Sequence, residues 1–133
     1  MTEPVWVTIE DVLGLHAMQL ATFGGPPGIR GRNGVESALS RPQQHWHYAA
    51  VSDLFQLAAI YVESFATTQH FVDGNKRVAL HSALLFLRLN GYRLEADRYL
   101  PAQAVLDVAN KVMTAEQMGL WFAAHSKVFD AAR

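Results

Sequence analysis

The sequence predicts an all-α fold with little or no sheet, and three observations support this prediction. Apolar residues recur at helical spacing along most of the chain, most regularly between Ser52 and Thr68. Residue pairs that typically cap helix starts precede several of these stretches. Half of the 133 residues are hydrophobic, which is enough for a core, and no linker or internal repeat is visible. We therefore expect residues 1–133 to form a single helical domain.

The first helix is expected over about residues 9–22. Thr8 and Asp11 form a typical capped start, and Gly24-Gly25 is a typical stop. The segment that follows, residues 24–34, holds five glycines and two prolines. This composition predicts a flexible loop that could act as a flap.

A short second helix is expected from a cap formed by Asn33 and Glu36. Pro42 is expected to end this helix, because proline lacks the N–H that a helix interior needs. Trp46 and Tyr48 are expected to hold the following segment against the body of the protein.

Two strongly apolar helices are expected next, over about residues 52–68 and 75–89. The second is so rich in Ala, Leu and Phe that it should be buried on most sides, and Asn90-Gly91 should end it. It is therefore the expected central helix. Residues 92–96 are predicted to be a short extended piece.

Two further helices complete the expected fold. Asp97 is expected to cap the first, which would run to about Lys111. Thr114 and Gln117 form a capping box for the last, which would run to about Ser126.

Composition argues against several functional classes. Eleven basic and twelve acidic residues give a formal net charge of −1, so there is no general attraction for nucleic acid or for an anionic membrane. The absence of cysteine excludes disulfides and thiolate chemistry and fits a reducing cytoplasm. The first residues do not resemble a signal peptide, and charges break the apolar runs well short of a membrane span. We expect a cytoplasmic protein with no direct nucleic-acid or membrane partner.

A polar turn between the two central helices is the candidate functional site. It reads Gln69-His70-Phe71-Val72-Asp73-Gly74-Asn75-Lys76-Arg77. A helix that begins here presents unpaired N–H groups and the positive end of its dipole, which together favour phosphate binding. Two cations are unfavourable beside that end of the dipole unless an anion joins them. The turn therefore predicts a phosphate site.

This turn and the helix after it resemble the signature of the Fic/Doc superfamily. The resemblance rests on Phe71-x-Asp73-Gly74-Asn75-Lys76-Arg77, followed by Ala83-Leu84-Leu85-Phe86-Leu87 and Asn90-Gly91. Lys after Gly-Asn is similar to the death-on-curing (Doc) branch, since Fic adenylyltransferases usually have Gly there. The likeness runs from about residue 10 to residue 126. It implies a helical bundle whose central buried helix follows the phosphate-binding loop.

The resemblance also implies a function. Doc-type proteins are toxins of bacterial type II toxin–antitoxin systems, and they transfer the terminal phosphate of ATP to a threonine of elongation factor Tu, which halts translation. ATP and Mg²⁺ would be the cofactors, and a Phd-like antitoxin would be the partner. Two alternatives remain open: a Fic-type protein adenylyltransferase, which Lys76 disfavours, and a catalytically silent protein that binds an antitoxin and regulates.

Residue roles follow from the same resemblance. Asp73 would hold Mg²⁺ or orient the attacking hydroxyl, and Lys76 would contact the transferring phosphates. Gly74 and Asn75 would form an anion nest with their backbone N–H groups. Arg77 would be a second phosphate contact or the partner of a carboxylate.

One position departs from the family pattern. In the family, the catalytic His stands two residues before the Phe that anchors the loop. The anchoring Phe is Phe71 in this chain, so the position of the catalytic His is occupied by Gln69, and His70 lies between the two. Gln cannot accept a proton at neutral pH, so the general base is missing by position. Two smaller departures are His81, where the Doc branch often has Asn, and Thr67, near a position where one type of relative has Arg.

Three explanations of this departure remain open. A locally altered turn could bring His70 into the catalytic place. Alternatively, the natural protein has lost transferase activity and kept the phosphate nest and the antitoxin surface. In the third explanation Gln69 was introduced to disarm a toxin.

Overall fold

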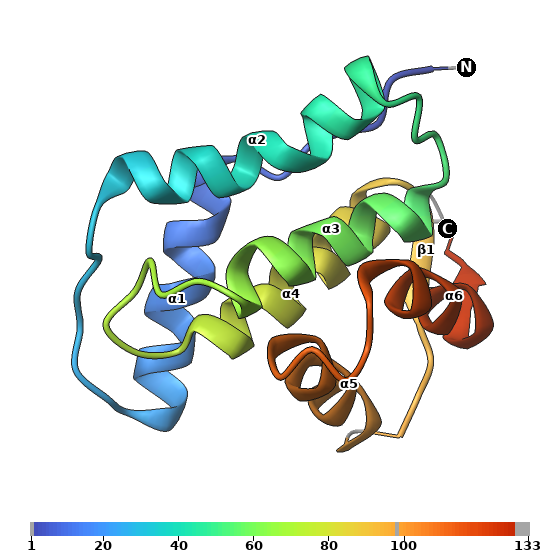
Figure 1. The fold of residues 1–133 in the computed structure, drawn as a ribbon. Helices are drawn as coiled ribbons and strands as arrows, with labels where there is room; N and C mark the ends of the chain where they lie inside the picture. Colours follow the sequence, from blue (N-terminus) through green and yellow to red (C-terminus); the bar gives the residue numbers. More distant parts are fainter. Residues whose placement is uncertain (1, 98, 130–133) are drawn as a thin grey trace.

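The computed structural model describes residues 2–97 and 99–129, and these residues are mostly helical. The elements, in chain order, are α1 (Ile9–Phe23), α2 (Arg32–Tyr48), α3 (Leu54–Ala66), α4 (Asn75–Leu89), β1 (Tyr92–Leu94), α5 (Tyr99–Ala109), α6 (Ala115–His125) and β2 (Ser126–Val128) (Figure 1). The predicted helical fold is confirmed. No helix within the described ranges has both the length and the apolar character needed to cross a membrane.

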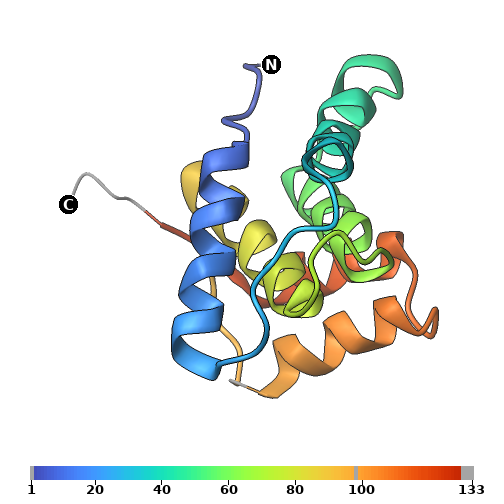
Figure 2. The same ribbon diagram turned by 90° about the vertical axis from the view of Figure 1, so that its left-hand side faces the viewer.

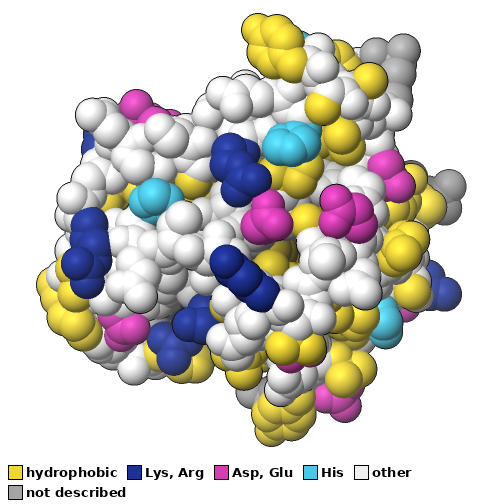
Figure 3. All heavy atoms as spheres, viewed as in Figure 1, with side chains coloured by type: hydrophobic (Ala, Val, Ile, Leu, Met, Phe, Trp, Pro, Cys, Tyr) yellow, Lys and Arg dark blue, Asp and Glu magenta, His cyan; other side chains and the backbone are white. Residues whose placement is uncertain are grey.

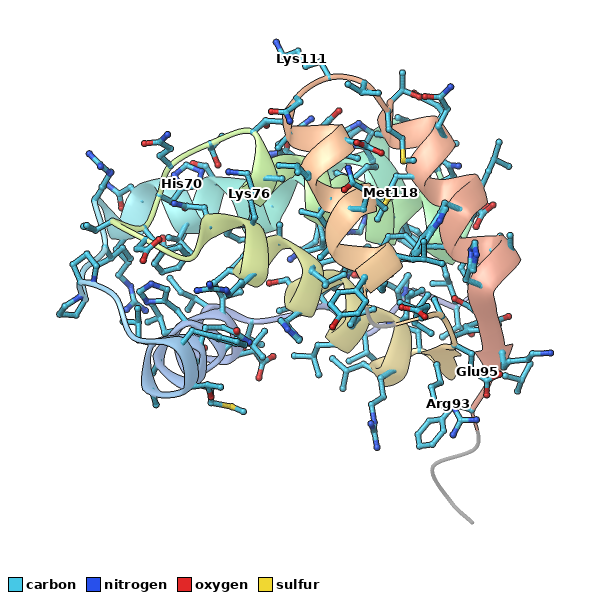
Figure 4. All side chains as sticks on the ribbon, turned by 90° about the horizontal axis from the view of Figure 1, so that it is seen from below. His70, Lys76, Arg93, Glu95, Lys111 and Met118 are labelled. Carbon is cyan, nitrogen blue, oxygen red and sulfur yellow. The ribbon has the colours of Figure 1, made fainter. Side chains whose placement is uncertain are left out.

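Helices α3 and α4 pack against each other at the centre of the fold (Figure 1). α3 also contacts α2, α5 and α6, while α4 also contacts α1, α5 and β1. Every residue of α4 from Val78 to Leu87 is buried or half-buried. The prediction of a central buried helix after the polar turn is therefore confirmed. Met118 of α6, labelled in Figure 4, is fully buried, and α6 packs against α3.

The helix starts that depend on local capping form as predicted. Thr8 Oγ1 accepts a hydrogen bond from the N–H of Asp11 at 3.2 Å, and the Asp11 carboxylate accepts one from the N–H of Thr8 at 3.0 Å. Thr114 and Gln117 form the same pair of bonds before α6, at 3.1 and 2.9 Å. Asp97 accepts from the N–H at the start of α5 at 3.1 Å. Each cap satisfies N–H groups that a helix start leaves unpaired.

The prediction for α2 was wrong at both ends. Gly31 is the N-cap and no side chain caps the helix, so Asn33 and Glu36 lie inside it. Pro42 also lies inside the helix, which continues to Tyr48. A proline in this position removes one backbone hydrogen bond, but the ring of Pro42 is buried, and this burial offsets the loss.

Only one of the two aromatic residues expected to anchor the end of α2 does so. Trp46 is partly buried and meets Trp6 edge-on, with ring centroids 6.4 Å apart. Trp6 in turn stacks on Phe86 of α4 at 5.7 Å. The prediction for Tyr48 was wrong, because the last turn of α2 extends beyond the neighbouring helices (Figure 1) and leaves this side chain 88% exposed.

A small antiparallel sheet closes the fold. The extended piece predicted over residues 92–96 is present as β1, and it pairs with β2 so that Arg93 lies opposite Lys127. The sequence did not predict the partner strand. β2 begins directly where α6 ends and runs back along β1.

Tyr61 ties the N-terminal segment to the core, and its substitution tests that link. Its hydroxyl accepts a hydrogen bond from the N–H of Val7 at 3.1 Å, and burial raises the pKa of Tyr61 well above its usual value. Tyr61→Phe leaves the buried N–H of Val7 without an acceptor, so we expect the free energy of unfolding in urea to fall by about 1–3 kcal/mol. Tyr48→Phe, at an exposed ring, should change it by less than about 0.5 kcal/mol. Equal stability of the two variants would contradict this account.

Candidate functional site

The polar turn joins α3 to α4 and lies alongside residues 24–31 (Figure 2). The flap was predicted over residues 24–34, but residues 32–34 belong to the first turn of α2, so the flap is residues 24–31. Two backbone hydrogen bonds connect the segments: the N–H of Arg30 donates to His70 O at 2.7 Å, and the N–H of Val72 donates to Gly28 O at 3.1 Å. They form an isolated antiparallel bridge between Ile29 and Phe71. The backbone of residues 70–72 is therefore extended and held from one side.

Phe71 and Asn75 fix the shape of the turn from within. The side chain of Phe71 is fully buried. Asn75 Oδ1 accepts a hydrogen bond from the N–H of Phe71 at 3.0 Å, and Asn75 Nδ2 donates to Phe71 O at 2.8 Å. The side chain of Asn75 thus closes the turn, and only its backbone N–H remains for the nest that the sequence predicts.

The start of α4 has the geometry of an anion site. Gly74 is the N-cap, with φ 85° and ψ 14°, a left-handed conformation that favours glycine. No side chain of the described residues caps the helix. The N–H groups of the first turn have no partner within the helix, so they can bind an anion.

A cleft of ≈ 630 Å³ opens at this helix start. It is lined by the end of α3, the turn, the start of α4 and the end of α5, namely Ala66, Thr67, Thr68, Gln69, Val72, Asp73, Gly74, Asn75, Lys76, Arg77, Ala109 and Asn110. The space-filling view shows Lys and Arg side chains gathered around the region where α4 begins (Figure 3). The contributions of Ala109 and Asn110 were not predicted from the sequence.

Lys76 and Arg77 are both exposed at the rim of the cleft. The guanidinium of Arg77 lies over the ring of Phe23, 4.4 Å from its centroid. Lys76 projects from the start of α4 (Figure 4), and within the described ranges its side chain forms no hydrogen bond or ion pair. Arg77 is thus held by α1, whereas the Lys76 ammonium is available to a ligand.

Asp73 is the only carboxylate among the described residues that line this cleft. Its Oδ1 accepts a hydrogen bond from the N–H of Gly74 at 2.8 Å. Its Oδ2 lies so close to Gly25 that a Cβ there would be 2.4 Å away. The described residues contain no cluster of three or more His, Cys, Asp or Glu that could hold a metal. Mg²⁺ often binds through one or two carboxylates together with substrate phosphates, so Asp73 fits a metal that arrives with a nucleotide.

The side chains of Gln69 and His70 lie on different sides of the turn, in two separate hollows. Gln69 is exposed and lines the cleft. His70 lines a separate hollow beside α2, where its Nδ1 would be 2.6 Å from a Cβ built on Gly34, and its ring meets Phe65 edge-on at 6.2 Å. Partial burial lowers the pKa of His70. Successive side chains of an extended backbone point to opposite faces, so this turn does not bring His70 into the cleft.

The two other departures from the family pattern also differ in position. Thr67 lines the cleft, and its hydroxyl donates to Glu63 O at 2.6 Å. His81 lies outside the cleft, in a hollow that it shares with Leu15 of α1. Burial lowers the pKa of His81.

One residue that contacts the site was missed. His16 of α1 lies beneath the turn, and its Nε2 is 2.9 Å from Asp73 O. The two residues are 57 positions apart, so no local pattern in the sequence could have indicated the contact.

Comparison with known proteins identifies the family of this chain. The Fic/DOC family model matches residues 6–87, which include the turn, all of α3 and all but the last two residues of α4. The chain is 38% identical over 88 residues to "Protein kinase doc" of Escherichia phage P1, covering 66% of this chain and 70% of that protein. It is 35% identical over 115 residues to "Toxin Doc" of Mycolicibacterium smegmatis, covering 86% of this chain and 83% of that protein. The chain therefore belongs to the Fic/DOC family, in its Doc branch.

Proposed function

We propose that this chain is a Doc-like toxin of a bacterial toxin–antitoxin system that binds ATP with its phosphates at the start of α4. The observation that carries this proposal is the uncapped helix start beside the unpaired Lys76 ammonium, inside a cleft large enough for a nucleotide. The relatives named "Protein kinase doc" and "Toxin Doc" support a phosphate-transferring toxin. A Phd-like antitoxin is the proposed partner, and elongation factor Tu, in the cytoplasm, is the proposed target.

The proposed reaction is phosphate transfer to a protein hydroxyl. A bond forms between the hydroxyl oxygen and the terminal phosphorus, the bond from that phosphorus to ADP breaks, and the hydroxyl proton must be taken up. The first-turn N–H groups and Lys76 would stabilise negative charge on the phosphate oxygens. Asp73 would supply one carboxylate ligand to Mg²⁺, and this ion, when bound with ATP, contributes further positive charge.

Among its described lining residues, the cleft offers no clear group to accept the hydroxyl proton, and this favours a second candidate function. The amide of Gln69 can hydrogen-bond the incoming hydroxyl but cannot accept its proton. His70 faces a different hollow. These two observations support a catalytically silent protein that keeps the nucleotide cleft and binds an antitoxin. A Fic-type adenylyltransferase is less well supported, because Lys76 stands where those enzymes usually have Gly.

Titration calorimetry with MgATP tests the proposed site. We expect Lys76→Ala to raise the Kd by about tenfold or more, because a hydrogen bond to a charged group contributes about 1.5–3 kcal/mol. Lys127→Ala is the matched control, since Lys127 is exposed on β2 and does not line the cleft. Failure of the unchanged protein to bind MgATP, or equal binding by the Lys76→Ala variant, would contradict the proposal.

Labelled ATP separates the candidate activities. Incubation of elongation factor Tu with γ-labelled ATP should label it if the chain is a kinase. Label from α-labelled ATP would instead indicate an adenylyltransferase, and label from neither would support the silent candidate.

A further inference from the structure

A buried histidine lies directly beneath the phosphate turn. His16 is only 7% exposed, and its Nε2 donates a hydrogen bond to Asp73 O at 2.9 Å. The hydrogen must be on Nε2, because a carbonyl oxygen can only accept. The His16 ring also stacks on Phe71, with centroids 4.1 Å apart and planes inclined by 24°. Helix α1 thus contacts both the anchor of the turn and its backbone through one side chain.

The bonded carbonyl belongs to the peptide that leads into α4. This peptide consists of the C=O of Asp73 and the N–H of Gly74, and in a planar trans peptide these two groups point in opposite directions. A hydrogen bond that draws the C=O toward α1 therefore directs the N–H of Gly74 away from α1. The ring also lies close under Gly74, since a Cβ built there would be 3.6 Å from His16 Cδ2.

His16 is the only group in residues 2–97 and 99–129 that donates to the carbonyl oxygen of Asp73. Without this donor the carbonyl would lose its partner at a part-buried position, which costs free energy. The cost would fall as the peptide turned toward water. Such a rotation would also redirect the N–H of Gly74, which now bonds Asp73 Oδ1.

We propose that His16 is a positioning residue for the phosphate cleft: its N–H donor sets the direction of the Asp73–Gly74 peptide, and so the position of the Asp73 carboxylate, which the N–H of Gly74 holds beside the start of α4. This inference rests on the proposed function only in naming the ligand. The positioning of the turn itself can be measured without any ligand.

Two substitutions separate the donor from the packing of the ring. His16→Phe keeps an aromatic ring for stacking and removes the donor. His16→Gln removes the ring and keeps an amide N–H at a similar reach. A positioning role requires the His16→Gln variant to bind MgATP more tightly than the His16→Phe variant, whereas a role in packing alone requires the reverse order.

The matched control is His125→Phe. His125 stacks on Trp121 at 4.4 Å and bonds Trp121 O at 2.8 Å, so it makes the same two kinds of contact on α6, outside the cleft. We expect the Kd for MgATP to rise about five- to tenfold in the His16→Phe variant, by less than about threefold in the His16→Gln variant, and not at all in the His125→Phe variant.

Amide hydrogen exchange gives a second readout that does not need a ligand. The N–H of Phe71 bonds Asn75 Oδ1 and the N–H of Val72 bonds Gly28 O, so both report on the turn. Their exchange should become about five- to tenfold faster in the His16→Phe variant and stay close to the original rate in the His16→Gln variant.

The outcomes distinguish a failure of the proposed function from a failure of the positioning role of His16. If the unchanged protein binds no MgATP, the proposed function fails, and the exchange rates still decide whether His16 positions the turn. Unchanged exchange at Phe71 and Val72 in the His16→Phe variant, or tighter MgATP binding by that variant than by the His16→Gln variant, overturns the inference.

Discussion

Replacing Gln69 with His is expected to raise the rate of phosphate transfer by about 10²–10⁴-fold, the usual contribution of a positioned general base. Gln69 already lines the cleft beside Asp73 and the start of α4, so the new imidazole would stand next to the bound phosphates. Because the Gln69 side chain is exposed, the change should alter the free energy of unfolding by no more than about 0.5 kcal/mol. The measurement is transfer of label from γ-labelled ATP to elongation factor Tu, together with growth arrest on expression without an antitoxin.

Three further variants make this result specific. Gln103→His introduces the same side chain on the exposed surface of α5, outside the cleft, and should leave transfer unchanged. Adding Lys76→Ala to Gln69→His should remove most of the gain. Adding His70→Ala should leave the gain intact, because His70 faces the hollow beside α2. Activity that is already present in the unchanged protein and is abolished by His70→Ala alone would show that His70 acts as the base.

The features that could be predicted from the sequence are those determined by neighbouring residues. A capping box joins groups three residues apart, so the starts of α1 and α6 could be read directly from Thr8 and Thr114. The phosphate turn is local in the same sense, since a left-handed glycine and the first turn of a helix lie within a few residues of each other. Its position between two apolar helices was also evident from their periodicity.

The features that could not be predicted depend on contacts between distant segments. Pro42 remains inside α2 because its ring is buried in the assembled fold, and no neighbouring residue in the sequence indicates that burial. β2 is a strand only because β1 lies beside it. His70 faces away from the cleft because the flap holds residues 70–72 extended, and this bridge joins segments about forty residues apart. The sequence thus indicated which residues form the turn, whereas the directions of their side chains depend on contacts with residues 28–30.

Phe71→Ala is expected to have the largest effect on stability of the substitutions considered. Its side chain is fully buried and stacks on His16, and the backbone on both sides of it is bonded to Asn75 and to the flap. Truncation of a buried Phe usually lowers the free energy of unfolding by about 3–5 kcal/mol, because the cavity cannot fully collapse. Urea denaturation should show this loss.

The matched control is Tyr48→Ala, which removes an aromatic side chain of similar size from an 88% exposed position. That variant should stay within about 0.5 kcal/mol of the unchanged protein. Removing the Phe71 ring should also change the shape of the cleft, because the ring packs against His16 and supports the turn that carries Asp73. In buffer without urea, where the Phe71→Ala variant remains folded, its affinity for MgATP should therefore be lower than that of the unchanged protein. The affinity of the Tyr48→Ala variant should not change. The contrary result has two parts: the free energy of unfolding of the Phe71→Ala variant falls by less than about 1 kcal/mol, well below the range usual for a buried Phe, and the variant binds MgATP normally. This result would mean that the turn keeps its shape without the Phe71 side chain.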